Sequence, residues 1–118
     1  MIDHQLMCLF EPLNRLPEYQ GLAKALAQPG AQGVFGLDDS QRLHLLAALA
    51  RDTGRPLILV TNSEQSAARC VQDLSQLLGE GVMAFPAREV SFLRTAAASH
   101  DLGMRRLHAL GMAVTGRL

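Results

Sequence analysis

The stretch GVFGLDDSQRLHLLAALARDTGRPLILVT, residues 33–61, decides the predicted fold. It opens with a short apolar segment, turns at residues 36–43, and then places leucines at the spacing of one helix face. Gly54 suits the C-terminus of that helix. The continuous apolar run Leu57–Val60 is typical of a strand buried on both faces of a parallel sheet. The stretch therefore predicts strand, turn, helix and strand in that order.

The flanking sequence continues this alternation. Further helices are expected over residues 17–28, 62–79 and 99–114. Asn62, with Gln65 three residues on, is the expected cap of the second of them, and Ser99 is the expected cap of the last. Strands are expected over residues 32–35, 57–60 and 82–85. This order predicts an α/β domain, with a parallel sheet and flanking helices. We expect an N-terminal arm and helix over residues 1–31, and a partial domain over residues 32–118 that is truncated at its C-terminus. An uncovered sheet edge would let such a fragment self-associate artificially.

Composition narrows the function classes. The chain has 118 residues, 48% of them hydrophobic, and its eleven basic residues balance eleven acidic ones. Net charge therefore gives no general attraction to nucleic acid or to an anionic membrane. The N-terminus carries an acid and no long apolar run, so we expect a cytoplasmic protein without a membrane span. Cys8 and Cys70 lie far apart, which favours buried, reduced thiols and no metal site.

The turn at residues 36–43 occupies the place of a phosphate-binding loop, GxxxxGK[ST]. Gly36 matches the first glycine of that pattern, but Gln41 replaces the second glycine and Arg42 replaces the lysine. Leu43 stands where a hydroxyl would hold magnesium, and a leucine side chain cannot ligate a metal ion. The turn is therefore predicted to be a degenerate nucleotide loop.

Three oxygen-bearing side chains in the same turn favour a structural role. Asp38 and Asp39 would repel phosphate oxygens, whereas a carboxylate or the Ser40 hydroxyl can accept hydrogen bonds from the free N–H groups of a helix N-terminus. We expect the protein's own oxygens to replace the phosphate. Weak nucleotide binding is the alternative.

Five motifs follow one another along the chain. They are Gly36-Leu37 with Ser40, LLAALA at residues 45–50, TGRPLILVT at 53–61, FPARE at 85–89 and RTAAASH at 94–100. In this order they resemble the N-terminal region of bacterial transcription-repair coupling factors, most clearly from residue 33 onward. The resemblance implies a RecA-like fold, that of P-loop NTPases, in a module similar to the excision-repair B subunit with a degenerate nucleotide loop.

The resemblance also implies how the whole protein works. The full-length family members are ATP-dependent DNA translocases that displace stalled RNA polymerase and recruit the excision-repair A subunit. ATP and magnesium belong to motor domains further along such a chain, so no cofactor is expected here. Contacts with DNA, RNA polymerase and the A subunit are expected through the full-length protein, together with intramolecular docking.

The arginines form a second candidate site. Arg88, Arg94, Arg105 and Arg106 could make a basic patch for a phosphate backbone or an acidic partner, or a solvated surface with local ion pairs such as Asp101 with Arg105. No nucleophile has a base beside it, so no catalytic residue is assigned. The favoured function is a non-catalytic scaffold and regulatory module. The alternatives are the nucleotide-binding domain of an active helicase or translocase, such as an excision-repair B subunit, and a small independent interaction domain.

Overall fold

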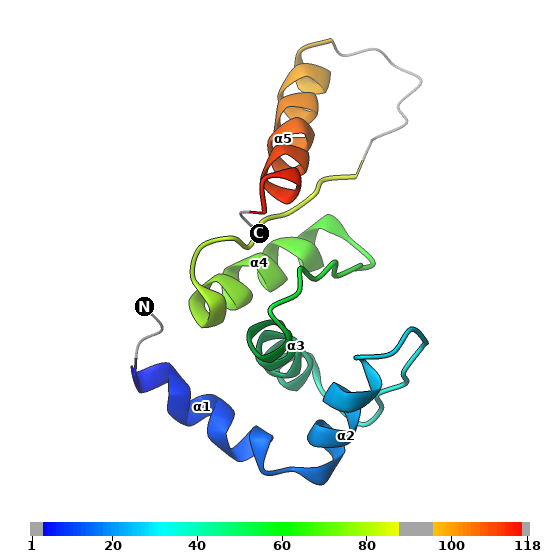
Figure 1. Cartoon of the computed structure of the whole chain (residues 1–118). Helices are drawn as coiled ribbons and strands as arrows, with labels where there is room; N and C mark the ends of the chain where they lie inside the picture. The colour runs from blue at the N-terminus through cyan, green and yellow to red at the C-terminus, as the bar shows by residue number, and fades with distance from the viewer. Residues whose placement is uncertain (1–3, 88–95, 117–118) are drawn as a thin grey trace. The chain divides into compact units, whose positions relative to one another are not determined.

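The computed structural model of the chain describes residues 4–87 and 96–116, and these residues form five helices (Figure 1). The helices are α1 (His4–Asn14), α2 (Pro17–Ala25), α3 (Asp39–Thr53), α4 (Glu64–Leu78) and α5 (Ala96–Val114). The chain divides into two compact units, Met1–Leu57 and Ile58–Leu118. The family-based boundary between residues 31 and 32 stays a prediction. No helix among the described residues is long and apolar enough to cross a membrane.

The first unit is a cluster of three helices. The helix α1 contacts both α2 and α3. Pro17 occupies the first turn of α2, where its missing N–H costs no hydrogen bond. The buried core of this unit consists of Phe10, Tyr19, Leu43, Ala47, Ala48 and Leu49. Phe10, from α1, is only 1% exposed and is the largest fully buried side chain among the described residues.

The C-terminus of α3 agrees with the sequence. Gly54 follows α3 in the left-handed conformation, with a φ of 61°, as a C-terminal glycine should. The cap of α4 is Ser63, one residue after the predicted Asn62, and it accepts a hydrogen bond from the Ser66 backbone N–H at 3.1 Å. The prediction for α5 is wrong at its start, because the helix begins at Ala96 and Ser99 lies inside it. The alanines before Ser99 have high helix propensity and extend the helix.

The predicted α/β fold is wrong for the described residues, which contain helices and no strand or sheet. Residues 32–35, 57–60 and 82–85 run as irregular chain, and in the described structure none of them takes part in a backbone–backbone hydrogen bond. Phe35 and Ile58 are 90% and 93% exposed, so these apolar runs are not the buried strands that were expected. An apolar run favours burial, but a strand forms only when a neighbouring strand completes its hydrogen bonds. The predicted RecA-like parallel sheet is therefore absent from the part of the chain that the structure describes.

Candidate functional site

The turn at residues 36–43 closes on itself at the N-terminus of α3. The Asp38 carboxylate accepts a hydrogen bond from the Gln41 backbone N–H at 2.8 Å. The Gln41 side-chain oxygen accepts one from the Asp38 backbone N–H at 3.0 Å. This reciprocal arrangement is a capping box. The capping role predicted for a carboxylate here is confirmed at Asp38, while Gly36, with a φ of 80°, permits the preceding turn.

The next side chains of the turn are also engaged within it. Arg42 donates through Nε to the Leu37 carbonyl at 3.1 Å, and its Nη1 lies 3.5 Å from an Asp39 carboxylate oxygen. Leu43 is buried in the core of the first unit. Asp39 and Ser40 are exposed in the first turn of α3. A phosphate that approached this turn would meet the Asp38 carboxylate at the helix N-terminus. The interpretation of residues 36–43 as a degenerate nucleotide loop remains a prediction.

The candidate basic patch is described only in part. Arg88 and Arg94 lie outside the described residues. Arg105 is exposed on α5. Arg106 donates from Nη1 to the Pro86 carbonyl, and its guanidinium lies 4.2 Å from the centroid of the Phe85 ring. This arginine therefore ties α5 to the chain that precedes it, and the patch itself stays a prediction.

A polar network that the sequence did not indicate joins the three helices of the first unit. The Tyr19 hydroxyl of α2 donates to the Asp52 carboxylate of α3 at 2.5 Å. Arg51 donates from Nε to the other oxygen of that carboxylate at 2.8 Å. The Arg51 guanidinium lies 4.4 Å from the centroid of the Phe10 ring, which is a cation–π contact. One carboxylate and one arginine thus connect α1, α2 and α3.

The network shifts the ionisation of two groups. Burial, the hydrogen bond to Asp52 and the negative charge of Asp52 raise the pKa of Tyr19 well above its ordinary value, against a smaller opposing effect of Arg51. Burial acts to raise the pKa of Asp52, but hydrogen bonds from Arg51 and Tyr19 and the charge of Arg51 bring that pKa below its usual value. Both pKa shifts favour the state in which the Tyr19 phenol is neutral and the Asp52 carboxylate is charged.

His44 also packs against the Phe10 ring. Its ring stacks with Phe10 at 5.3 Å between centroids, and its Nε2 lies 2.7 Å from the Leu9 carbonyl oxygen. A hydrogen bond at this distance requires the proton on Nε2, because a carbonyl oxygen only accepts. His44 therefore holds α3 against the backbone of α1.

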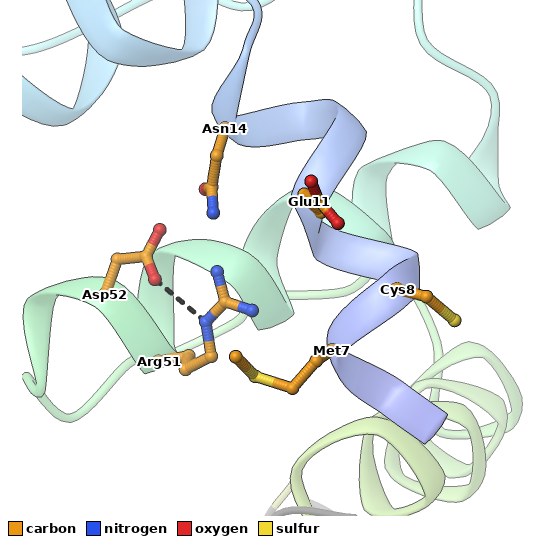
Figure 2. Close-up of a pocket in the computed structure, with 6 residues that line it drawn as sticks. All are labelled: Met7, Cys8, Glu11, Asn14, Arg51 and Asp52. Atoms are coloured by element: carbon orange, nitrogen blue, oxygen red, sulfur yellow. Dashed lines mark hydrogen bonds and ion pairs between the residues drawn. The ribbon is translucent and has the colours of Figure 1, made fainter. Parts of the chain in front are cut away.

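A surface hollow lies beside this network, between α1 and α3 (Figure 2). Its lining residues are Met7, Cys8, Glu11, Asn14, Arg51 and Asp52. Cys8 is exposed and Cys70 is half-buried, so the expectation of two buried thiols is wrong for Cys8. Within the described part of the chain, no group of three or more His, Cys, Asp or Glu side chains could hold a metal ion.

The sequence does not indicate the network because Tyr19 and Asp52 are 33 residues apart. Arg51-Asp52 has the pattern of an ordinary polar helix end. A weak signal was available, since the chain contains a single tyrosine near the start of a predicted helix. Nothing in the local pattern names its partner.

Replacement of Asp38 tests the self-capped turn. Asp38→Ala should lower the free energy of unfolding by about 1 kcal/mol, since it removes the acceptor of the capping box. Asp39→Ala is the matched control, because that carboxylate is 98% exposed and its ion pair with Arg42 is long. Urea unfolding followed by circular dichroism measures both variants. Equal losses from the two substitutions would contradict the capping role.

The single tyrosine makes the buried phenol directly observable. In the folded chain, ultraviolet absorbance should show Tyr19 ionising well above about pH 10, the ordinary value, and the urea-unfolded chain should titrate normally. A raised folded pKa gives stability that is complete below the unfolded pKa and is lost as pH rises toward the folded pKa. Stability should therefore fall more steeply above about pH 10 in the wild type than in Tyr19→Phe. Ordinary titration of the folded chain would disprove the Tyr19–Asp52 pairing.

Comparison with known proteins shows a distant relation. The chain is 32% identical to the transcription-repair-coupling factor of Bacillus subtilis (strain 168) over 86 residues, which are 72% of this chain. It spans only 7% of the length of that relative. No family model matches the chain, and no solved structure matches it. The resemblance noted in the motifs is thus supported as a partial one: the chain is distantly related to a region of transcription-repair coupling factor.

Proposed function

We propose that the chain is a non-catalytic N-terminal module of a transcription-repair coupling factor. The observation that carries this proposal is the 32% identity over 86 residues to the Bacillus subtilis protein of that name. In the full-length protein, an ATP-dependent DNA translocase, this module supports the displacement of stalled RNA polymerase and the recruitment of the excision-repair A subunit. Its own part is to dock against other regions of the same protein.

The geometry of the α3 N-terminus supports a non-catalytic role. A phosphate loop binds its ligand through backbone N–H groups that are free to face the phosphates. Here the Gln41 N–H donates to the Asp38 carboxylate at 2.8 Å. That negative charge occupies the position where an anion would gain most from the helix dipole. The turn is therefore a structural cap.

The position corresponding to the magnesium ligand supports the same conclusion. Leu43 is buried in the helix cluster and offers no oxygen atom. A serine or threonine in place of Leu43 would also remove apolar surface that the leucine buries in the core of the first unit. ATP and magnesium are accordingly assigned to motor domains elsewhere in the full-length protein.

Nucleotide titration tests the absence of a working site. Thermal unfolding of the 118-residue chain should be unchanged by millimolar ATP with magnesium, and the chain should not hydrolyse ATP. A ligand at 100 times its Kd would add about 2.7 kcal/mol of stability, so specific binding would raise the Tm visibly. The Asp38→Ala variant is a useful comparison, because it removes the carboxylate from the turn. A saturable, magnesium-dependent shift in the unmodified chain would favour the alternative of an active nucleotide-binding domain.

A chimaera tests the role within the coupling factor. The 86 matched residues of the Bacillus subtilis protein would be replaced by those of this chain, and compared with a deletion of the same region and with the intact protein. We expect the chimaera to match the intact protein in its rate of ATP hydrolysis and in displacement of stalled RNA polymerase, because the module supplies docking and no chemistry. The deletion should differ from both. A chimaera that behaves as the deletion does would refute the proposed function.

A further inference from the structure

The hollow between α1 and α3 is lined by Arg51, whose guanidinium is held in place by two contacts (Figure 2). Nε donates to the Asp52 carboxylate at 2.8 Å, and the central carbon of the group lies 4.4 Å from the centroid of the Phe10 ring. The remaining N–H groups, on Nη1 and Nη2, donate to no acceptor in the described part of the chain. A fixed arginine thus has unused donors.

The unused donors reach solvent through the hollow. The Arg51 side chain is only 15% exposed. Among the described residues, however, no buried side-chain nitrogen or oxygen lacks a hydrogen-bond partner. Nη1 and Nη2 therefore contact water, and the hollow is the opening that Arg51 lines. A guanidinium that is already held in place loses little conformational entropy when it binds an acceptor.

A second donor comes from α1. Figure 2 shows the Asn14 side chain pointing toward the Arg51 guanidinium. The Asn14 backbone carbonyl accepts a hydrogen bond from Gln20, but its side-chain amide has no hydrogen-bond partner within residues 4–87 and 96–116. That amide carries two N–H donors. A ligand with two acceptor oxygens, placed between Asn14 and Arg51, would bind to both.

The charges around the hollow favour an anion with a single charge. Two carboxylates line the hollow, and each is already paired with an arginine: Glu11 with Arg15, and Asp52 with Arg51. A cation would have to compete with these arginines for the carboxylates. The same carboxylates repel a doubly charged phosphate about twice as strongly as a singly charged ligand. A carboxylate also matches the planar guanidinium, because it can accept two parallel N–H bonds.

The hollow has room for more than a carboxylate. Its volume is about 650 Å³, within the range of about 300–1,000 Å³ that is usual for small-molecule sites. The Met7 side chain extends from α1 toward Arg51 (Figure 2), so it forms an apolar wall beside the donors. The Cys8 side chain points away from the guanidinium. This chemistry suits an acid with a short apolar chain.

We propose that this hollow binds a carboxylate that carries a short apolar chain. The carboxylate oxygens accept hydrogen bonds from Arg51 Nη1 and Nη2 and from the Asn14 amide, and the chain lies against Met7. A free carboxylic acid and the C-terminal residue of a peptide both present this group. The inference rests on the first unit alone and does not depend on the proposed role in repair.

Nuclear magnetic resonance titration of the full 118-residue chain tests the site with three probes at equal ionic strength. Sodium butanoate supplies the carboxylate, n-butylammonium chloride has the same carbon chain with a positive charge, and inorganic phosphate is a second anion. We expect butanoate to bind saturably in the millimolar range and to shift the Arg51 Nε and Asn14 side-chain signals. The other two probes should leave those signals unchanged. No saturable shift with butanoate, or an equal shift with either other probe, would overturn the proposal.

Two substitutions test the site and keep the Arg51 contacts that hold α1 against α3. Asn14→Asp keeps the size of the side chain and places a carboxylate beside the guanidinium, so it should weaken butanoate binding by about tenfold or more. Glu11→Gln removes a negative charge and should tighten binding. Gln32→Glu is the control, because it adds a charge at an exposed position outside the hollow. Unchanged binding in Asn14→Asp, or weaker binding in Glu11→Gln, would contradict the proposal.

A dipeptide distinguishes the two sources of the carboxylate. N-acetyl-alanyl-valine has a free C-terminal carboxylate, and its C-terminal amide has the same chain without the charge. Tighter binding of the peptide acid than of butanoate would identify a peptide C-terminus as the ligand, and weaker binding would identify a free acid. The amide should not bind. An amide that binds as tightly as the peptide acid would show that the carboxylate is not recognised.

Discussion

The packing of Phe10 beneath Arg51 is the contact on which the first unit depends. The ring is almost completely buried, and the guanidinium that lies over it donates a hydrogen bond to Asp52. Tyr19 then binds the same carboxylate from α2. An arginine suits this position because its planar group can cover an aromatic ring and still donate a hydrogen bond from its edge. Without that stack, the buried phenol and the carboxylate would lose the group that orients them.

At the start of α3, polar groups of the protein also satisfy one another. There the helix N-terminus is satisfied by Asp38, with Gln41 completing the box, whereas a phosphate-binding protein would leave those N–H groups to its ligand. Arg42 donates a hydrogen bond from Nε to the Leu37 carbonyl of the turn that precedes it. The helix α3, which follows the candidate nucleotide loop, thus has its N-terminus capped by side chains of the protein itself. The closed turn is one of the observations that support the non-catalytic role proposed above.

The second unit presents the contrasting situation. Its helix α4 has a strongly amphipathic sequence, yet none of its residues is fully buried. Ile58 and Val60 precede it and are exposed, and Leu107 and Val114 of α5 are exposed as well. Large apolar side chains of the second unit thus stay uncovered in the described part of the chain.

The sequence by itself determined the central parts of α2, α3, α4 and α5. The capping box at Asp38, the proline at position 17 and the glycine at position 54 act within a few residues of where they stand, and the hydrogen bonds of a helix close inside the same segment. The C-terminus of α3 could therefore be predicted directly, whereas the cap of α4 lies one residue after the predicted position. The motifs also sufficed to find the relation to transcription-repair coupling factor, which needs only the order of residues.

Only the tertiary structure decided the rest. The run Leu57–Val60 has the composition of a buried strand, but a strand takes its hydrogen bonds from a distant segment, and in the described residues no such segment is paired with it. The same holds for Tyr19 and Asp52, whose contact spans 33 residues. The local sequence pattern determines which secondary structure each segment prefers. A sheet or a buried polar network forms only when two segments that are distant in the sequence come into contact. Packing over the whole chain determines whether they do.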